Sequence, residues 1–357
     1  RPLAGTVVLA GTPRTARGTR ALPKMQPDGF GDGKEEKMKC GGIARFAAMT
    51  CIGWICVLAQ EATQFTSIRR LTNSEVQLRL NAASTYRIDV STNLADWAPL
   101  LSAARQSTQH IDAGATFRER RFYAMQDLAG TNLLTGDHIA TTDGDVIIRP
   151  VDHASFVMRW KEMMIYNDPV GGSGTYAAFP RANLILVSHT HGDHFHAGTI
   201  GAVRATNGVI IAPQAVFNQL SGASRSAAIV LTNGASTNIN GVLVEAVPAY
   251  NNNHPRGAGN GYVLTIGGKR FYMAGDTGAT PEMRALENID VAFLCMNVPF
   301  TMDVNTAASA AREFKPRILY PYHYRNGGSP TTYADLNLLK RLIGTEDGIE
   351  VRVREWY

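Results

Sequence analysis

The sequence lacks an apolar run long enough to cross a membrane. Its 357 residues are 45% hydrophobic, but no segment reaches the ~20 consecutive apolar residues that a transmembrane helix needs. A chain of this length is long for one domain and suits one catalytic domain with a smaller companion. We therefore expect no stable membrane span.

Cysteine is also scarce. The chain has four, and Cys40, Cys51 and Cys56 lie close together near the N-terminus. If that segment is removed, only Cys295 remains, and an internal disulfide is then impossible. Cys295 ends a buried strand pattern, so we interpret it as a core residue rather than a catalytic one.

The body of the chain has no excess of basic charge. The formal net charge is +5, and residues 1–59 account for it with nine basic and four acidic residues. Residues 60–357 carry equal numbers of each sign. Proteins that bind polyanions usually show a basic face. The balance argues against a nucleic-acid partner and favours a small-molecule substrate.

Residues 38–59 have the order of a secretory signal peptide. Lys39 and Arg45 precede an apolar run over 46–59, which ends in the small residue Ala59. This order predicts cleavage after Ala59 and a secreted or periplasmic mature protein. A buried helix or a short membrane anchor are the alternatives.

A β-rich module is expected over residues 66–127. Apolar and polar residues alternate over 76–80 and 86–90, which is typical of half-buried strands, and 121–125 suits a third. The stretch 86–97, together with 121–123, resembles small β-sandwich modules that are appended to many secreted bacterial proteins. The module contains no cluster of His, Cys or carboxylates, so we expect it to be dispensable for metal binding.

Strands and helices alternate after a linker over 128–136, and this pattern predicts a layered α/β domain. Strands are expected over 145–149, 155–160, 163–167, 183–188, 241–247, 261–266, 269–273, 291–295 and 317–321, and helices over 198–205, 213–220, 280–286 and 305–314. The chain thus divides into an upstream segment with a signal peptide (1–59), the β-rich module (66–127) and a catalytic domain (134–357).

Four potential metal ligands follow the apolar strand pattern over 183–188. They are His189, His191, Asp193 and His194. Imidazole nitrogen and carboxylate oxygen suit a divalent ion such as zinc, with iron or manganese as alternatives. Four ligands in six residues fit poorly around one tetrahedral ion but suit two neighbouring ions.

The segment His-x-His-x-Asp-His resembles the signature of the metallo-β-lactamase superfamily. Three further matches follow in the family's order: His254 in 249–255, Asp276 in 271–277 and His323 in 320–324. The resemblance covers residues 134–357. It is strongest to the branch with ascorbate-phosphate lactonase-like and N-acyl-phosphatidylethanolamine phospholipase D-like proteins. It implies a four-layer αββα fold.

The resemblance also implies two metal ions, with Zn²⁺ expected and Mn²⁺ or Fe²⁺ possible. The implied ligands are His189, His191 and His254 for the first ion, Asp193, His194 and His323 for the second, and Asp276 for both. A metal lowers the pKa of bound water to ~7, which supplies a hydroxide nucleophile at neutral pH. Asp193 could also orient this nucleophile, so Asp193 and Asp276 are the candidate catalytic residues.

Other candidates are less specific. His196 could support a ligand or lie on the following helix, and His153 could lie near the site or at a strand edge. Tyr322, Tyr324 and Asn297 could line the pocket. His110 and His138 have no partner in the sequence and are interpreted as surface residues.

The sequence therefore predicts a metal-dependent hydrolase of a small ester, lactone, amide or phosphodiester. Two alternatives stay open. One is a phospholipase D-like phosphodiesterase, and the other is an extracellular binding protein that keeps the fold without catalysis. Loss of ligands would indicate the binding protein, whereas all seven expected positions are filled. The sequence leaves the substrate and the oligomeric state open.

Overall fold

The computed structural model describes residues 8–11, 63–105, 107–128, 134–328 and 331–357. The expected signal peptide over 38–59 lies outside these residues. Within the described part, no helix is both long and apolar enough to cross a membrane.

The β-rich module has two sheets with a common core. One sheet has the order β2-β3-β6, and strands β1, β7, β4 and β5 are neighbours in the other. Val76, Leu78 and Leu80 alternate with more exposed residues along β3, as a half-buried strand requires. They pack with Tyr86 and Tyr123 of the second sheet. The strands are β1 (Val8–Gly11), β2 (Gln64–Arg70), β3 (Val76–Asn81), β4 (Tyr86–Ser91), β5 (Ala98–Ala103), β6 (Gln109–Asp112) and β7 (Arg120–Asp127).

Two larger groups of strands form the rest of the molecule. The first has the order β8-β9-β10-β11-β12-β13-β14 and continues the sheet of β5, because β8 pairs with β5. These strands are β8 (Gly136–Thr141), β9 (Gly144–Asp152), β10 (Ser155–Trp160), β11 (Met163–Asn167), β12 (Ala182–Leu186), β13 (Arg204–Ala212) and β14 (Ala228–Val230).

The second group is a seven-stranded sheet with the order β15-β16-β17-β18-β19-β20-β21. Its strands are β15 (Ser236–Ile239), β16 (Val242–Ala249), β17 (Gly259–Ile266), β18 (Lys269–Met273), β19 (Val291–Cys295), β20 (Ile318–Tyr322) and β21 (Glu350–Val351). The helices are α1 (Ala197–Val203), α2 (Gln214–Gln219), α3 (Gly222–Ser226), α4 (Pro281–Arg284), α5 (Val304–Phe314) and α6 (Leu336–Leu342).

The pleat of β12 explains why its sequence is apolar throughout. Leu184 and Leu186 join the large core that includes strands of the second sheet, whereas Ile185 and Val187 join a smaller core with Ile200 of α1. Successive side chains on a strand point to opposite faces, so both faces of this strand are buried.

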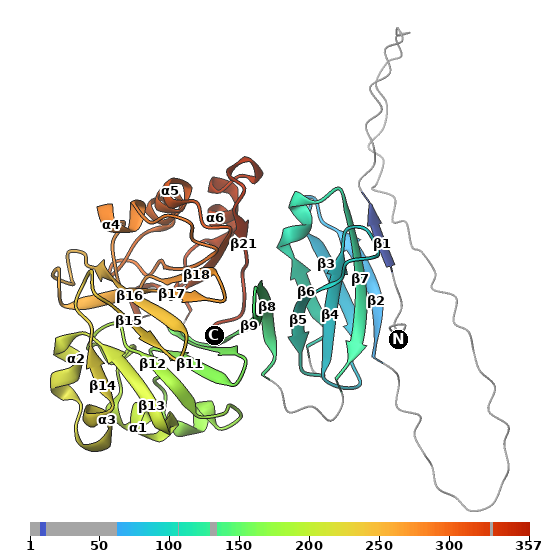
Figure 1. The fold of residues 1–357 in the computed structure, drawn as a ribbon. Coiled ribbons are helices and arrows are strands. Elements are labelled where there is room, and N and C mark those ends of the chain that lie inside the picture. The colour runs from blue at the N-terminus through green and yellow to red at the C-terminus, as the bar shows by residue number, and fades with distance from the viewer. Residues whose placement is uncertain (1–7, 12–62, 106, 129–133, 329–330) are drawn as a thin grey trace, which may run out of the picture. The chain divides into compact units, whose positions relative to one another are not determined.

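The catalytic domain has the layers helix, sheet, sheet and helix. Helices α1, α2 and α3 lie beside β12 to β14, and α4, α5 and α6 lie on the other side, next to the second sheet (Figure 1). The expected four-layer αββα arrangement is therefore confirmed.

Several elements differ from the expectations. The helix expected over 198–205 ends at Val203, because β13 begins at Arg204 and pairs with β12. The sequence reasoning also missed β13 and α6 (Leu336–Leu342). Strand β13 begins with the mostly polar residues 204–207, and only its apolar end, which pairs with β12, has a strand-like sequence.

Candidate metal centre

The candidate ligands gather at the carboxyl ends of four strands. The segment from His189 to His194 follows β12, and His254 follows β16. Asp276 follows β18, and His323 directly follows β20. The two sheets pack face to face, so loops that are far apart in sequence meet at one edge.

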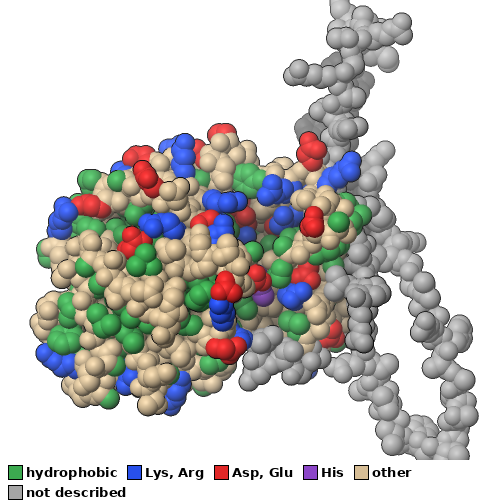
Figure 2. Space-filling view, viewed as in Figure 1, with side chains coloured by type: hydrophobic (Ala, Val, Ile, Leu, Met, Phe, Trp, Pro, Cys, Tyr) green, Lys and Arg blue, Asp and Glu red, His purple; other side chains and the backbone are tan. Residues whose placement is uncertain are grey.

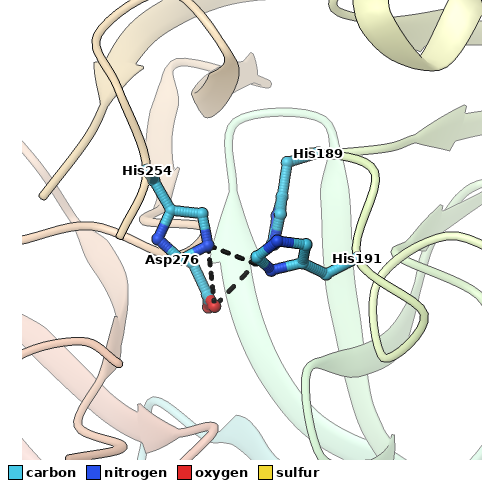
Figure 3. Close-up of side chains that lie close together, drawn as sticks. All are labelled: His189, His191, His254 and Asp276. Carbon is cyan, nitrogen blue, oxygen red and sulfur yellow. Dashed lines mark hydrogen bonds and ion pairs between the residues drawn. The ribbon is translucent and has the colours of Figure 1, made fainter. Parts of the chain in front are cut away.

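One cluster contains His189, His191, His254 and Asp276, whose ligand atoms lie within 4.8 Å of one another. Figure 3 shows the side chains converging from the three loops. Nε2 of His254 lies 3.1 Å from Nδ1 of His191. Oδ2 of Asp276 lies 3.8 Å from Nε2 of His189 and 3.7 Å from Nε2 of His254.

A second cluster lies on the other side of Asp276. It contains His194, His323 and Asp276, and Asp193 adjoins it. Nε2 of His194 and Nε2 of His323 are 2.9 Å apart. Oδ2 of Asp193 lies 3.4 Å from Nε2 of His323 and 3.7 Å from Nε2 of His194.

The two oxygens of Asp276 face different clusters. Oδ1 lies 3.2 Å from Nε2 of His194 and 3.3 Å from Nε2 of His323. Oδ2 faces His189 and His254 instead. The structure thus places one buried carboxylate between two groups of imidazoles.

The donor sets fit divalent cations. Nε2 of His189 and Oδ1 of Asp276 are buried and have no hydrogen-bond partner among the described residues. An unpaired buried polar atom costs about 1–3 kcal/mol, and a cation would satisfy both atoms. A tetrahedral ion with ligands at ~2.0–2.1 Å spaces neighbouring ligand atoms by about 3.4 Å. The separations of 2.9 to 3.7 Å in the second cluster lie on both sides of this value.

Asp168 and Ser188 orient the rings of His189 and His194. Oδ2 of Asp168 accepts hydrogen bonds from Nδ1 of His194 at 2.8 Å and from the Ser188 hydroxyl at 2.8 Å. The Ser188 oxygen lies 3.0 Å from Nδ1 of His189 and can accept its proton. With Nδ1 protonated, each neutral ring turns an unprotonated Nε2 toward the centre.

Asp168 supports the candidate ligands, and the sequence reasoning missed it. It follows β11 directly, is fully buried, and has a φ of 43° in the left-handed region. Its Oδ1 also accepts the backbone N–H of Ser188 at 2.7 Å. The sequence did contain a signal for this residue, because a carboxylate that directly follows an apolar strand lies at the same sheet edge as the candidate ligands.

Asn251 fixes the ring of His254 in a similar way. Its Oδ1 lies 2.9 Å from Nδ1 of His254 and also accepts the backbone N–H of His254 at 3.0 Å. The proton is therefore held on Nδ1, and Nε2 is left free to face His191.

Burial and neighbouring charges set the protonation of the buried groups. Burial lowers the pKa of His189 well below its ordinary value, and it also lowers that of His254. Burial raises the pKa of Asp276, but the neighbouring His323 and His194 outweigh this and hold it well below the usual range. Burial opposes the charge of His194 as well, yet Asp276 and Asp168 raise its pKa well above 6.5. Without a metal, the ionised carboxylate of Asp276 therefore lies beside a charged His194 and beside His189 and His254, whose charged forms burial disfavours. A bound cation would take the place of the extra proton on His194, because a histidine ligand must be neutral.

The sequence left the roles of His196 and His153 open, and the structure gives these two residues different roles. His196 is the N-cap of α1, and its Nδ1 accepts the backbone N–H of Thr199 at 3.0 Å. His153, in the turn between β9 and β10, lies beside the second cluster, with Nε2 3.3 Å from Oδ2 of Asp193.

The candidates for lining the pocket, Tyr322, Tyr324 and Asn297, make hydrogen bonds to backbone groups of neighbouring segments. The Tyr322 hydroxyl accepts the backbone N–H of Gly275, and the Tyr324 hydroxyl donates to the carbonyl of Arg354. Asn297 accepts the backbone N–H of Gly327. Cys295 is fully buried in the core, as expected.

The interpretation of His110 and His138 as surface residues was wrong. Both are half-buried. Nε2 of His110 lies 2.6 Å from the Tyr86 hydroxyl, and His138 contacts Ser102 and Asp145, each at 3.0 Å. Their partners lie on neighbouring strands, so nothing in the local sequence indicated them.

The four-layer fold, with two His–Asp clusters at its strand ends, defines the class as metallo-β-lactamase-fold hydrolases. The model of the β-lactamase superfamily domain matches residues 148–323. A metal-dependent hydrolase of Pyrococcus abyssi is 30% identical over 219 residues, which are 58% of this chain and 96% of that protein. One from Thermococcus kodakarensis is 31% identical over 210 residues, covering 56% and 92%.

Solved structures agree with these relatives. A protein of Parabacteroides distasonis, named as a metal-dependent hydrolase, has a TM-score of 0.56 and 39% identity, covering 63% of this chain and all of that one. A metallo hydrolase of Ignicoccus hospitalis has a TM-score of 0.51 and 23% identity, covering 59% and 95%, and shows the fold alone. The chain belongs to the metal-dependent hydrolases of the β-lactamase superfamily.

Proposed function

We propose that the protein uses two divalent metal ions to hydrolyse a small ester, lactone, amide or phosphodiester. The observation that carries the proposal is the position of Asp276, whose two oxygens face separate clusters. The first ion would be held by His189, His191 and His254, the second by Asp193, His194 and His323, and Asp276 would belong to both.

Bound ions would supply Lewis acidity and an activated water. The chain itself positions the reacting groups. Asp168, Ser188 and Asn251 fix the tautomers of three of the imidazoles. Asp276 fixes the spacing of the two clusters, and Asp193, whose side chain is 45% exposed, faces the open side of the centre. Such preorganised polar groups reduce the reorganisation that the reaction would otherwise need.

The surroundings of the centre support a substrate with an apolar part. The carbonyl of Phe300 accepts a hydrogen bond from Asn251, so its loop lies beside that of His254. Phe300 and Tyr357 are among the few large apolar side chains that are exposed in the described structure. Arg325 stacks on Tyr357 at 4.5 Å and could meet an anion. A phosphodiester therefore belongs in any substrate panel.

The face of the protein in Figure 2 gives no support for a polyanionic substrate. On the face shown in Figure 2, Lys and Arg side chains are interspersed with Asp and Glu. Because a nucleic acid requires a continuous basic surface, this face supports the proposal of a small substrate.

The test is metal content by mass spectrometry together with turnover of an ester, lactone, amide and phosphodiester panel. We expect two ions per chain. His191→Ala should weaken mainly the first ion and His323→Ala mainly the second, and Asp276→Ala should weaken both and abolish most turnover. His196→Asn is the matched control, because it alters a histidine of the same segment and retains a helix cap. One tightly bound ion that His323→Ala does not affect would contradict the paired site.

We also propose export, which the basic-apolar-small order of residues 38–59 supports. Protein made in a secreting host should begin at Gln60 when its N-terminus is sequenced. Soluble cytosolic protein with an intact leader would reject this proposal.

A further inference from the structure

His153 lies against the second cluster without belonging to the seven expected ligands. It occupies the turn between β9 and β10, is 8% exposed, and has a φ of 51°. Its carbonyl accepts the backbone N–H of His323 at 3.1 Å, and the two rings have centroids 3.8 Å apart. Nε2 of His153 faces Oδ2 of Asp193 at 3.3 Å. Such a buried turn in a left-handed conformation is costly unless its surroundings hold it.

The other ring nitrogen of His153 faces the hydroxyl of Tyr357. Nδ1 and this oxygen are 2.8 Å apart. The same oxygen accepts the backbone N–H groups of Tyr324 at 3.1 Å and Arg325 at 3.2 Å. Both lone pairs of the hydroxyl are therefore used, and its own proton remains to be donated. The acceptor in reach is Nδ1 of His153.

We propose that Tyr357 and His153 form a positioning relay for Asp193. The Tyr357 hydroxyl donates to Nδ1 of His153, which fixes the proton of the ring on Nε2, and this N–H donates to Oδ2 of Asp193. His153 is then a positioning residue, and Tyr357 selects its tautomer. Asp193 is held in one orientation beside His194 and His323. Groups that orient a ligand in this way commonly contribute 10–100-fold to metal affinity.

A different role for His153 would require the opposite tautomer. Its ring nitrogen, Asp193 and His323 lie close enough to hold an ion among themselves. A ligand must present a lone pair, so Nε2 would then carry no proton, and Nδ1–H would have to donate to Tyr357. That oxygen already accepts two N–H groups. The geometry therefore assigns His153 to the relay rather than to the ligand set.

The role of the relay in metal binding rests on the proposed function, whereas the tautomer of His153 does not. The experiment therefore measures both. Protein with ¹⁵N-labelled histidine is examined by long-range ¹H–¹⁵N NMR, metal-free and after addition of Zn²⁺, and the His153 signals are assigned by their loss in His153→Gln. Affinity for each Zn²⁺ is measured by competition with a chromophoric chelator.

We expect His153 to be protonated on Nε2 in both states. Tyr357→Phe should shift the ring toward a mixture of tautomers and weaken the second Zn²⁺ by 10–100-fold, leaving the first unchanged. His153→Gln, which keeps an N–H donor, should lose less affinity than His153→Ala. Tyr324→Phe is the matched control, because Tyr324 contacts the ring of Tyr357 but donates to Arg354. It should change neither readout.

Three results would overturn the relay. One is a proton on Nδ1 with Nε2 bound to Zn²⁺, which would make His153 a ligand. Another is a tautomer that Tyr357→Phe leaves unchanged. The third is a shifted tautomer with unchanged affinity for the second Zn²⁺, which would leave Asp193 unaffected by the relay. If the protein binds a single Zn²⁺, the proposed function fails, and the NMR result still decides the tautomer.

Discussion

At the scale of single residues, the buried carboxylate of Asp168 orients side chains of the candidate metal centre. It makes hydrogen bonds to the ring of His194, to the hydroxyl of Ser188 and to the Ser188 backbone. None of these partners is near it in sequence. Through them, one side chain controls the direction in which two candidate ligands point.

Asp168→Asn should weaken the second ion by 10–100-fold, because an amide holds the His194 ring less well than a carboxylate. Metal affinity is measured by chelator competition, and thermal unfolding of the metal-free protein reports any loss of stability separately. Asp145→Asn is the control, since Asp145 pairs with His138 at 3.0 Å outside the clusters. Equal effects of the two changes on metal affinity would contradict a specific role for Asp168.

Cys295 should be chemically inert in the folded protein. Burial raises the pKa of its thiol to about 12, and only the thiolate is an effective nucleophile. We expect iodoacetamide at pH 8 to leave Cys295 unmodified in the native state and to modify it in urea. Peptide mapping distinguishes it from Cys40, Cys51 and Cys56. Rapid native labelling of Cys295 would show that the strand end opens in solution.

At the scale of elements, α5 shows how a local signal and tertiary packing combine. Its N-cap, Asp303, accepts the backbone N–H of Thr306 at 2.7 Å. Its inner face buries small alanines and ends on Phe314, which packs against Tyr272 of the second sheet. The cap defines where the helix begins, and the apolar face defines what it covers.

Asp303→Ala should lower the free energy of unfolding by about 1 kcal/mol, because the backbone N–H loses its acceptor. The measurement is urea unfolding, with a shift of the midpoint at constant slope. Asp303→Asn retains the acceptor and should be close to neutral. Loss of turnover in Asp303→Ala beyond its loss of folded protein would mean that α5 acts on the centre directly.

At the scale of the whole molecule, the candidate metal centre lies entirely after the β-rich module in the sequence. All seven candidate ligands fall between residues 189 and 323, and the two cores around them begin at Leu134. The described contacts to the β-rich module include the pairing of β8 with β5 and the ion pair between Lys340 and Glu75 at 2.7 Å. The ion pair is partly buried, with the side chains of Lys340 and Glu75 24% and 9% exposed, and β8 pairs with β5 at only two positions.

A shortened chain that starts at Leu133 should therefore fold and bind two ions per chain. We expect a modestly lower thermal midpoint, because the edge of β8 is exposed. Circular dichroism and metal analysis test this, with the chain from Gln60 as the reference. A well-folded shortened chain without metal would show that the module contributes to the centre.

The sequence determined the class of the protein and its candidate ligands. His189 to His194 lie close together in the chain, and the apolar residues before them predict a buried strand that ends at one point in space. The family resemblance added His254, Asp276 and His323. Helix α5 and the strands with simple alternation were also predictable, because their signals repeat within a few residues.

Only the tertiary structure decided which groups support those ligands. Asp168 and Tyr357 act through hydrogen bonds to rings that other loops supply, whereas Asn251 orients the ring of His254 in its own loop. The sequences around His153 and His196 resemble those of ordinary polar turns. Their separate roles depend on which strand ends the packing of two sheets brings together. Hydrogen bonds reach only about 3 Å, so contacts of this kind have no signature along the chain.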